Sequence, residues 1–178
     1  MHKRKSDLLS CGMAVLMSLA VTGCGSEPLT MIVGTYTNEC ASRGVYSYIF
    51  DQEKGALVGG EGGRFAEAPG AVGRVEIRNP SYLTLSADGK FVYAVSEVGD
   101  SSASAVTLRL DSKTGEVQML GAELTDGKDP CYISTNGKVV MTANYSSGNV
   151  TEFPIGEDGV LLPHDFLYET GLGGPDIV

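Results

Sequence analysis

Several polar residues stand where strand-like runs of this sequence end, and their side chains could do chemistry. Glu97 follows the apolar run Phe91–Ser96. A carboxylate held in such a loop can act as a general base toward a water molecule. It can equally be a solvated loop acid, or an acceptor for neighbouring backbone amides. We take Glu97 as the candidate catalytic residue and keep both alternatives open.

Two polar pairs occupy similar positions. Tyr36-Thr37 follows an apolar run that begins at Met31, and Asn144-Tyr145 follows the run that begins at Val139. Their hydroxyl and amide groups could hydrogen-bond a polar ligand. The structural alternative is a turn in which Asn144 bonds the backbone and Tyr145 packs between neighbouring elements. Tyr36 and Thr37 share that ambiguity.

The elements that must position these side chains recur along the chain. The segment Asn79-Pro80-Ser81-Tyr82-Leu83 is echoed by Asp129-Pro130-Cys131-Tyr132-Ile133, and Pro80 and Pro130 lie 50 residues apart. Each segment is followed by a turn sequence, Asp88-Gly89-Lys90 or Asn136-Gly137-Lys138, and then by a strand-like run. Short strands repeating at this period are typical of β-propeller blades.

The repeat predicts an all-β fold, a partial β-propeller of about three four-stranded blades. The first blade should lack its innermost strand, because nothing before Met31 reads as one, and a helical signal segment should precede it. The glycine-rich stretch 59–73 is expected to be a long surface loop. We expect first-blade strands at 31–36 and 44–50. From inner to outer, the second blade should have strands at 81–86, 91–96, 104–110 and 117–123. In the same order, the third should have strands at 131–134, 139–143, 149–154 and 165–169.

Antiparallel alternation places one set of loops on one face. We call this set the rim: it comprises Thr35–Asn38, Asn79-Pro80, Glu97, Asp129-Pro130 and Asn144-Tyr145. The rim should surround one end of a central channel. Because propellers need at least four blades, we read the chain as the N-terminal portion of a larger protein.

The N-terminus predicts export. Lys3-Arg4-Lys5 precedes a short apolar core, Leu8–Ala20, which ends in Val21-Thr22-Gly23-Cys24. We expect a lipoprotein signal peptide at 1–23, a linker at 24–30 and the propeller at 31–178. Lipid on Cys24 would be the only membrane attachment and would place the protein in a bacterial cell envelope, on the periplasmic or surface side. The alternative is a plain secretory signal cut near Gly23.

Charge and cysteine content indicate which kinds of ligand and covalent link to expect. The formal net charge is −9, which argues against nucleic acid. There is no Cys/His cluster and no phosphate-binding loop, so we expect no metal site and no cofactor. Cys40 and Cys131 could form a disulfide in an oxidising compartment, although two partly buried free thiols are favoured.

Together these motifs resemble one family. Val33–Thr37, Gly44–Tyr48 and the proline segments, combined with Asp88–Glu97 and Ala143–Val150, are similar to the bacterial lactonase family of seven-bladed propellers, the 6-phosphogluconolactonase type. The resemblance implies that the full-length protein hydrolyses a small-molecule sugar lactone. Glu97 would then activate water, and Tyr36, Thr37, Asn144 and Tyr145 would bind sugar hydroxyls.

Two other functions stay open. One is a non-catalytic propeller that binds a glycan or a protein partner on its channel face. The other is a ring-opening or cyclising enzyme of the muconate type. Within the lactonase hypothesis, an exported protein fits an unphosphorylated lactone better than a phosphorylated one.

Overall fold

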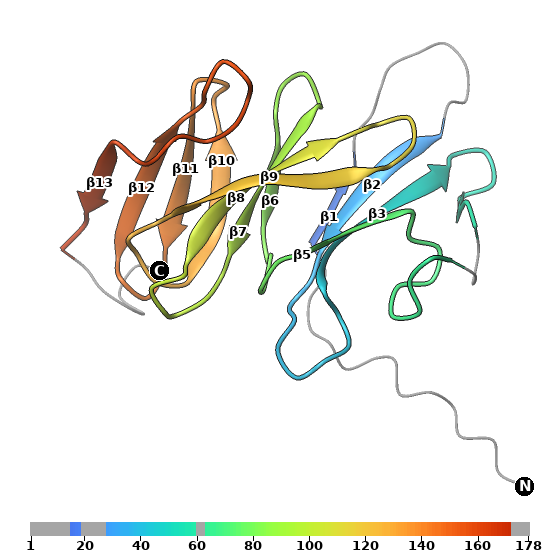
Figure 1. Ribbon diagram of the computed structural model, residues 1–178, viewed down its shortest axis with the longest axis horizontal. Helices are drawn as coiled ribbons and strands as arrows, with labels where there is room; N and C mark the ends of the chain where they lie inside the picture. The colour runs from blue at the N-terminus through green and yellow to red at the C-terminus, as the bar shows by residue number, and fades with distance from the viewer. Residues whose placement is uncertain (1–14, 19–27, 60–62, 172–178) are drawn as a thin grey trace, which may run out of the picture.

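The structure is a computed structural model that describes residues 15–18, 28–59 and 63–171, with side chains from residue 28 onward. The described residues form thirteen strands in three antiparallel sheets. Figure 1 shows the sheets side by side, from the blue and cyan first blade to the red third blade. The predicted all-β, partial propeller is confirmed.

The first blade has a divided outer edge. Its central strand β3 pairs with β2 on one side and with two short strands on the other. One of these, β4, pairs at the far end of β3 (Phe50 with Leu57), whereas β5 pairs at its start (Val45 with Val75). The strands of this blade are β1 (Val15–Ser18), β2 (Leu29–Gly34), β3 (Gly44–Asp51), β4 (Ala56–Leu57) and β5 (Gly73–Glu76).

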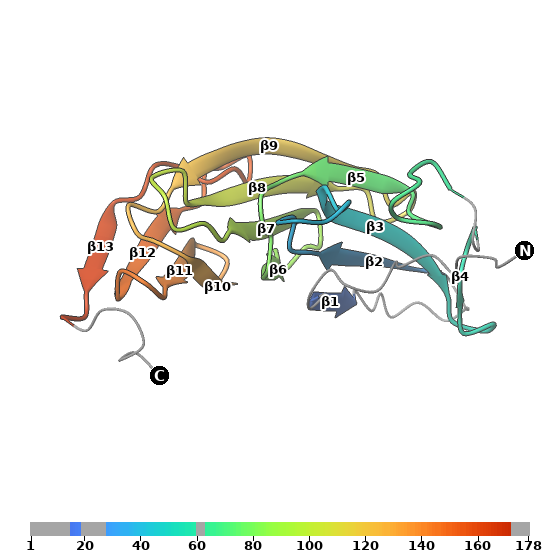
Figure 2. The ribbon, with the colours of Figure 1, turned by 90° about the horizontal axis from the view of Figure 1, so that it is seen from below.

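The second and third blades are simple four-stranded meanders. The second contains β6 (Leu83–Leu85), β7 (Phe91–Ser96), β8 (Ser104–Leu110) and β9 (Val117–Leu124), paired in that order. The third contains β10 (Pro130–Thr135), β11 (Val139–Asn144), β12 (Asn149–Pro154) and β13 (Phe166–Glu169). In Figure 2, β1, β6 and β10 follow one another along the concave side of the arc.

Apolar side chains fill the spaces between blades, because alternate residues of each strand face a neighbouring sheet. Between the first and second blades lies a cluster that includes Ile32, Val45, Leu83 and Leu108. Between the second and third blades, Tyr93, Ile133 and Phe153 form another cluster. All of these side chains are at most 2% exposed. The two cores fix the angle between blades and thereby the positions of the rim loops.

The first blade differs from expectation at its inner edge. Residues 15–18, which we predicted to be part of a helical signal core, form β1 and pair antiparallel with β2 (Val15 with Gly34, Ser18 with Met31). In the chain that retains residues 1–23, the inner position of this blade is therefore occupied rather than empty. The physical reason is that β2 presents unpaired backbone groups at that edge, and an extended apolar segment can satisfy them. The other residues of the expected signal, and Cys24, lie outside the described residues.

Two further boundaries differ. Strand β2 begins at Leu29, inside the expected linker 24–30. Strand β5, which sequence reasoning missed, begins at Gly73, the last residue of the expected loop 59–73. Among the described residues, no helix is long and apolar enough to cross a membrane.

Candidate functional site

Glu97 lies directly after β7 and receives two hydroxyl groups. The Tyr36 phenol donates to its Oε2 at 2.9 Å, and the Ser81 hydroxyl donates to the same oxygen. No described residue donates to Oε1. We call Tyr36, Ser81 and Glu97 the Glu97 cluster. It joins a loop of the first blade to two segments of the second.

A left-handed residue builds this corner. Asn79 has a φ of 45° and precedes Pro80, a conformation that only surrounding contacts make tenable for a non-glycine residue. Its carbonyl accepts the amide of Ser81 at 2.8 Å and the amide of Glu97 at 3.1 Å. Its side-chain amide donates to the Glu97 carbonyl at 3.1 Å. The backbone on both sides of Glu97 is thus held by one residue.

Thr37 ties the first blade to that corner. Its amide and its hydroxyl donate to Asn79 Oδ1 at 2.9 and 3.1 Å, and its hydroxyl accepts the Asn79 amide at 3.2 Å. The Thr37 side chain therefore has a structural role between blades in this conformation. Sequence reasoning considered both roles for it, and the geometry favours the structural one.

The third blade repeats the same turn. Asp129 has a φ of 51° and precedes Pro130, and its carbonyl accepts the amide of Tyr145 at 3.0 Å. The Asp129 amide in turn donates to the Val98 carbonyl at 2.9 Å. Tyr145 therefore occupies in its blade the place that Glu97 occupies in the second. Its side chain is 39% exposed, so it is available to a ligand. Hydrogen bonds thus connect the loops of the predicted rim from the first blade to the third.

Asn144 is buried, unlike its neighbour Tyr145. Its side chain is 1% exposed and donates to Asn149 Oδ1 at 2.8 Å and to Thr151 Oγ1 at 2.9 Å. Its own oxygen accepts the Thr142 hydroxyl at 3.2 Å. This network closes the β11–β12 turn, so the geometry favours the structural alternative for Asn144.

The electrostatics of the site follow from Glu97. Burial raises the pKa of the Tyr36 phenol, and the hydrogen bond to Glu97 and its negative charge raise it further. Burial also raises the pKa of the Cys131 thiol, again with a contribution from the charge of Glu97. Both groups are neutral at pH 7, since their ordinary values are already above 7. Cys131 is therefore a poor nucleophile here.

The cysteines differ from expectation in one respect. Cys131 is a free thiol, as favoured; the residue is exposed overall, although neighbouring atoms partly desolvate its sulfur. Cys40 is a disulfide cysteine, so the interpretation of both as free thiols was wrong for Cys40, and the two do not pair with each other. Within the described ranges, no group of three or more His, Cys, Asp or Glu side chains could hold a metal ion.

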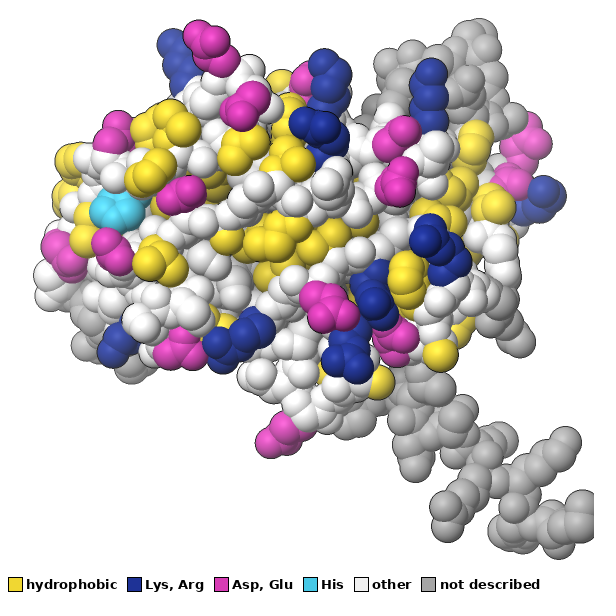
Figure 3. All heavy atoms as spheres, viewed as in Figure 1, with side chains coloured by type: hydrophobic (Ala, Val, Ile, Leu, Met, Phe, Trp, Pro, Cys, Tyr) yellow, Lys and Arg dark blue, Asp and Glu magenta, His cyan; other side chains and the backbone are white. Residues whose placement is uncertain are grey.

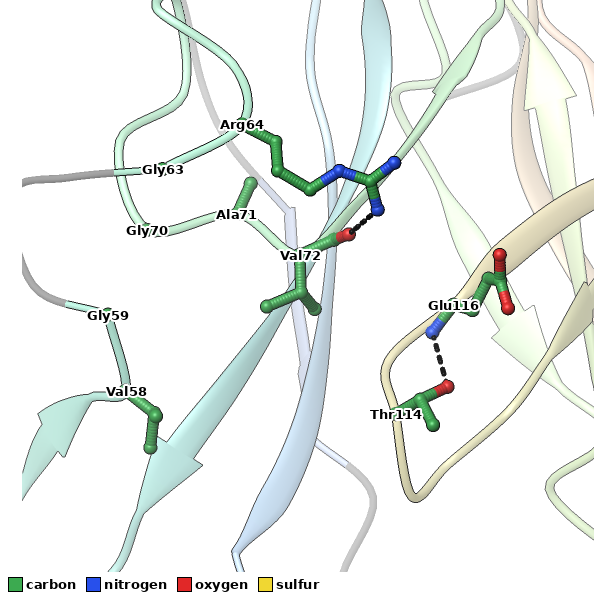
Figure 4. Close-up of a pocket in the computed structure, with 9 residues that line it drawn as sticks. All are labelled: Val58, Gly59, Gly63, Arg64, Gly70, Ala71, Val72, Thr114 and Glu116. Atoms are coloured by element: carbon green, nitrogen blue, oxygen red, sulfur yellow. Dashed lines mark hydrogen bonds between the residues drawn. The ribbon is translucent and has the colours of Figure 1, made fainter.

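Other surfaces carry weaker candidates. A cavity of about 530 Å³ lies between the glycine-rich segment and the β8–β9 turn. Figure 4 shows Arg64 reaching the Val72 carbonyl there, with backbone and apolar groups around it. No member of the Glu97 cluster lines this cavity. On the face seen in Figure 3, acidic and basic side chains are intermixed.

Comparison with known proteins identifies the family to which this chain is similar. The family model described as "Lactonase, 7-bladed beta-propeller" matches residues 30–177. The chain is 35% identical over 144 residues to the 6-phosphogluconolactonase of Bacillus subtilis (strain 168), covering 79% of this chain and 38% of the relative. A 6-phosphogluconolactonase of Formosa agariphila is 25% identical over 147 residues, with 80% and 38% covered.

Solved structures that resemble this chain carry lactonase names as well. A Bacteroides fragilis protein provisionally assigned as a 6-phosphogluconolactonase is 42% identical with a TM-score of 0.72, covering 85% of this chain and 38% of that one. The periplasmic gluconolactonase of Pseudomonas aeruginosa is 30% identical with a TM-score of 0.65, with 78% and 38% covered. This chain thus spans well under half the length of these relatives. With the three blades, the rim and the family match in agreement, the chain belongs to the lactonase family of seven-bladed β-propellers.

Proposed function

We propose that the whole protein hydrolyses a sugar lactone and that Glu97 is its general base. The observation that supports this role is the Glu97 carboxylate itself, which lies on the rim and is held at Oε2 while Oε1 receives no donor from the described residues. An oxygen left free in this way can accept a proton from water.

The chemistry is a simple ester hydrolysis. Water adds to the lactone carbonyl carbon as Oε1 takes one of its protons. The bond between that carbon and the ring oxygen then breaks, and the ring oxygen takes up a proton to become a hydroxyl. The product is an open-chain sugar acid. Negative charge develops on the carbonyl oxygen during the attack, so donors are needed there.

The polar residues of the rim divide into two groups under this proposal. Tyr36 and Tyr145 lie where a sugar could contact them, Tyr145 being the more exposed. Thr37 and Asn144 act chiefly through the fold, because their side chains are engaged with Asn79 and with the β11–β12 turn. We therefore assign sugar contacts to the two tyrosines first.

The substrate class follows from location, which is itself part of the proposal. Export and a lipid on Cys24 would place the protein in the cell envelope, where an unphosphorylated sugar lactone is the more accessible substrate. One relative carries the name periplasmic gluconolactonase, and others carry the name 6-phosphogluconolactonase. Radiolabelled palmitate should enter the wild-type protein and not the Cys24→Ser variant; labelling of both would refute the anchor.

Hydrolysis can be tested directly. We expect the whole protein to release acid from gluconolactone in a pH-stat, faster than from its 6-phosphate. Glu97→Gln should lower kcat by about 10²–10⁴-fold, the usual contribution of a general base. Ser146→Ala, an exposed change in the β11–β12 turn, is the control and should leave kcat unchanged. Glycan binding without hydrolysis would refute the enzyme and favour a binding propeller.

A further inference from the structure

We infer that Tyr36 and Ser81 are positioning residues for the Glu97 carboxylate, and that the Glu97 cluster works as a unit shared between the first two blades. Ser81 was not among the residues that the sequence singled out. The kinetic part of this inference rests on the proposed function. Its structural part can be tested without any substrate.

The geometry carries the inference. Both hydroxyl groups donate to one oxygen, Oε2, so rotation of the carboxylate would break two hydrogen bonds at once. Oε1 is therefore presented in one orientation. Such fixed orientation is what proton transfer in a bound complex requires.

Ser81 is itself held firmly. It is 8% exposed, and its amide donates to the Asn79 carbonyl at 2.8 Å. The hydroxyl consequently approaches Glu97 from a constrained backbone rather than from a flexible loop. A positioning residue must have this rigidity, because a mobile donor would not restrict its partner.

Tyr36 brings the other blade into the arrangement. It follows β2, and Gly34 of that strand lies so close to Pro80 that a methyl group there would be 2.0 Å from the Pro80 carbonyl oxygen. Pro80 is flanked by Asn79 and Ser81. The contact between blades therefore sets the distance from the Tyr36 phenol to the carboxylate that Ser81 also holds.

The three groups leave a signature in the titration of Tyr36. Burial and Glu97 raise the pKa of the phenol, whereas a hydrogen bond from Ser81 lowers it. The two neighbours act in opposite directions. Glu97 favours the neutral phenol, whereas the single proton of the Ser81 hydroxyl, which goes to Glu97 while Tyr36 is neutral, can turn to the phenolate once Tyr36 ionises. Removing each in turn should move the Tyr36 pKa in opposite directions.

The experiment is a ¹³C NMR titration of the chain with tyrosine labelled at Cζ, in which Tyr36→Phe assigns the resonance. We expect Glu97→Gln to lower the Tyr36 pKa and Ser81→Ala to raise it. Ser81→Thr keeps the hydroxyl and should leave the wild-type value, and Ser146→Ala is the control. The inference is overturned if either change leaves the Tyr36 pKa where it was, or if both move it in one direction.

Kinetics separate this inference from the proposed function. In the whole protein, Ser81→Ala should lower kcat about tenfold with KM little changed, and Ser81→Thr should restore kcat. Tyr36→Phe should lower kcat by a similar factor and also raise KM, because Tyr36 is assigned a sugar contact as well. Opposite shifts in a protein that hydrolyses no lactone would refute the function and retain the cluster. Hydrolysis without the shifts would refute the positioning role alone.

Discussion

Gly34 is the position at which one added methyl group should test the packing between blades. It ends β2 and pairs with Val45 of β3. The Cβ of an alanine would lie 2.0 Å from the Pro80 carbonyl oxygen and 3.0 Å from Leu83 Cδ1. Gly34 does not have a positive φ, so the effect of Gly34→Ala is steric rather than conformational.

The magnitude follows from the overlap. Cβ atoms essentially never come within 3.0 Å of such an atom, so the Pro80 carbonyl must retreat by about 1 Å. Overpacking of a filled core costs about 1–3 kcal/mol. The obstructing atom belongs to the backbone and cannot rotate away, so we expect the upper end, about 3 kcal/mol. The ratio of folded to unfolded protein should fall roughly a hundredfold.

Urea unfolding followed by far-ultraviolet circular dichroism at low protein concentration measures this loss. Gly121→Ala is the matched control, because its methyl group would meet only Val160 Cγ1 at 3.5 Å, an ordinary contact. It should be neutral or slightly stabilising. A loss below about 0.5 kcal/mol for Gly34→Ala would show that the two blades do not pack as described.

Three further predictions concern single side chains. Asn144→Ala should lower the free energy of unfolding by about 2 kcal/mol in urea titrations, because it leaves buried hydrogen-bonding partners unsatisfied; an unchanged midpoint would contradict the buried network. Cys131 should react with iodoacetamide at pH 8 more slowly than a free cysteine despite its exposure, and Glu97→Gln should speed the reaction, since burial and that charge raise the thiol pKa; equal rates would contradict the proximity. The pKa of Asp88 is about 2, lowered chiefly by the Ser86 hydroxyl. Its stabilising effect should be present above pH 4 and lost as the pH falls toward 2. Because half of the Asp88 side chain is exposed to solvent, which screens the interaction, the loss should stay below about 1 kcal/mol, and acid titration of Asp88→Asn should lack this component.

The regular blades could be predicted from sequence because local pattern and tertiary environment agree in them. The bounds of β7, β8 and β12 match the predicted ones. Each has an alternating or continuous apolar pattern bounded by turn residues, so the hydrophobic pattern and the turn residues indicate the same strand ends. The first blade was harder. Strand β5 has the sequence Gly-Arg-Val-Glu, which contains too few apolar residues for a strand to be predicted from their pattern.

The site was predicted in outline and missed in detail for related reasons. Glu97 and Tyr36 were singled out separately from their loops, but their hydrogen bond joins residues 61 apart, which no local pattern reports. Ser81 sits in a proline turn, where serine is ordinary. The one sequence feature that could have drawn attention to Ser81 is that it occupies the same place in its repeat as Cys131 does in the other. Asn144 was ambiguous because a turn asparagine and a ligand-binding asparagine have the same sequence context.

The left-handed residues before Pro80 and Pro130 have a consequence for diversification. Each orients the residue after the proline, which is Ser81 in the second blade and Cys131 in the third. The backbone contacts that create the turn involve neither of these side chains. The presenting scaffold is thus separable from the group presented. Exchange at positions 81 and 131 should change the polar surroundings of Glu97 while the blades themselves keep their architecture.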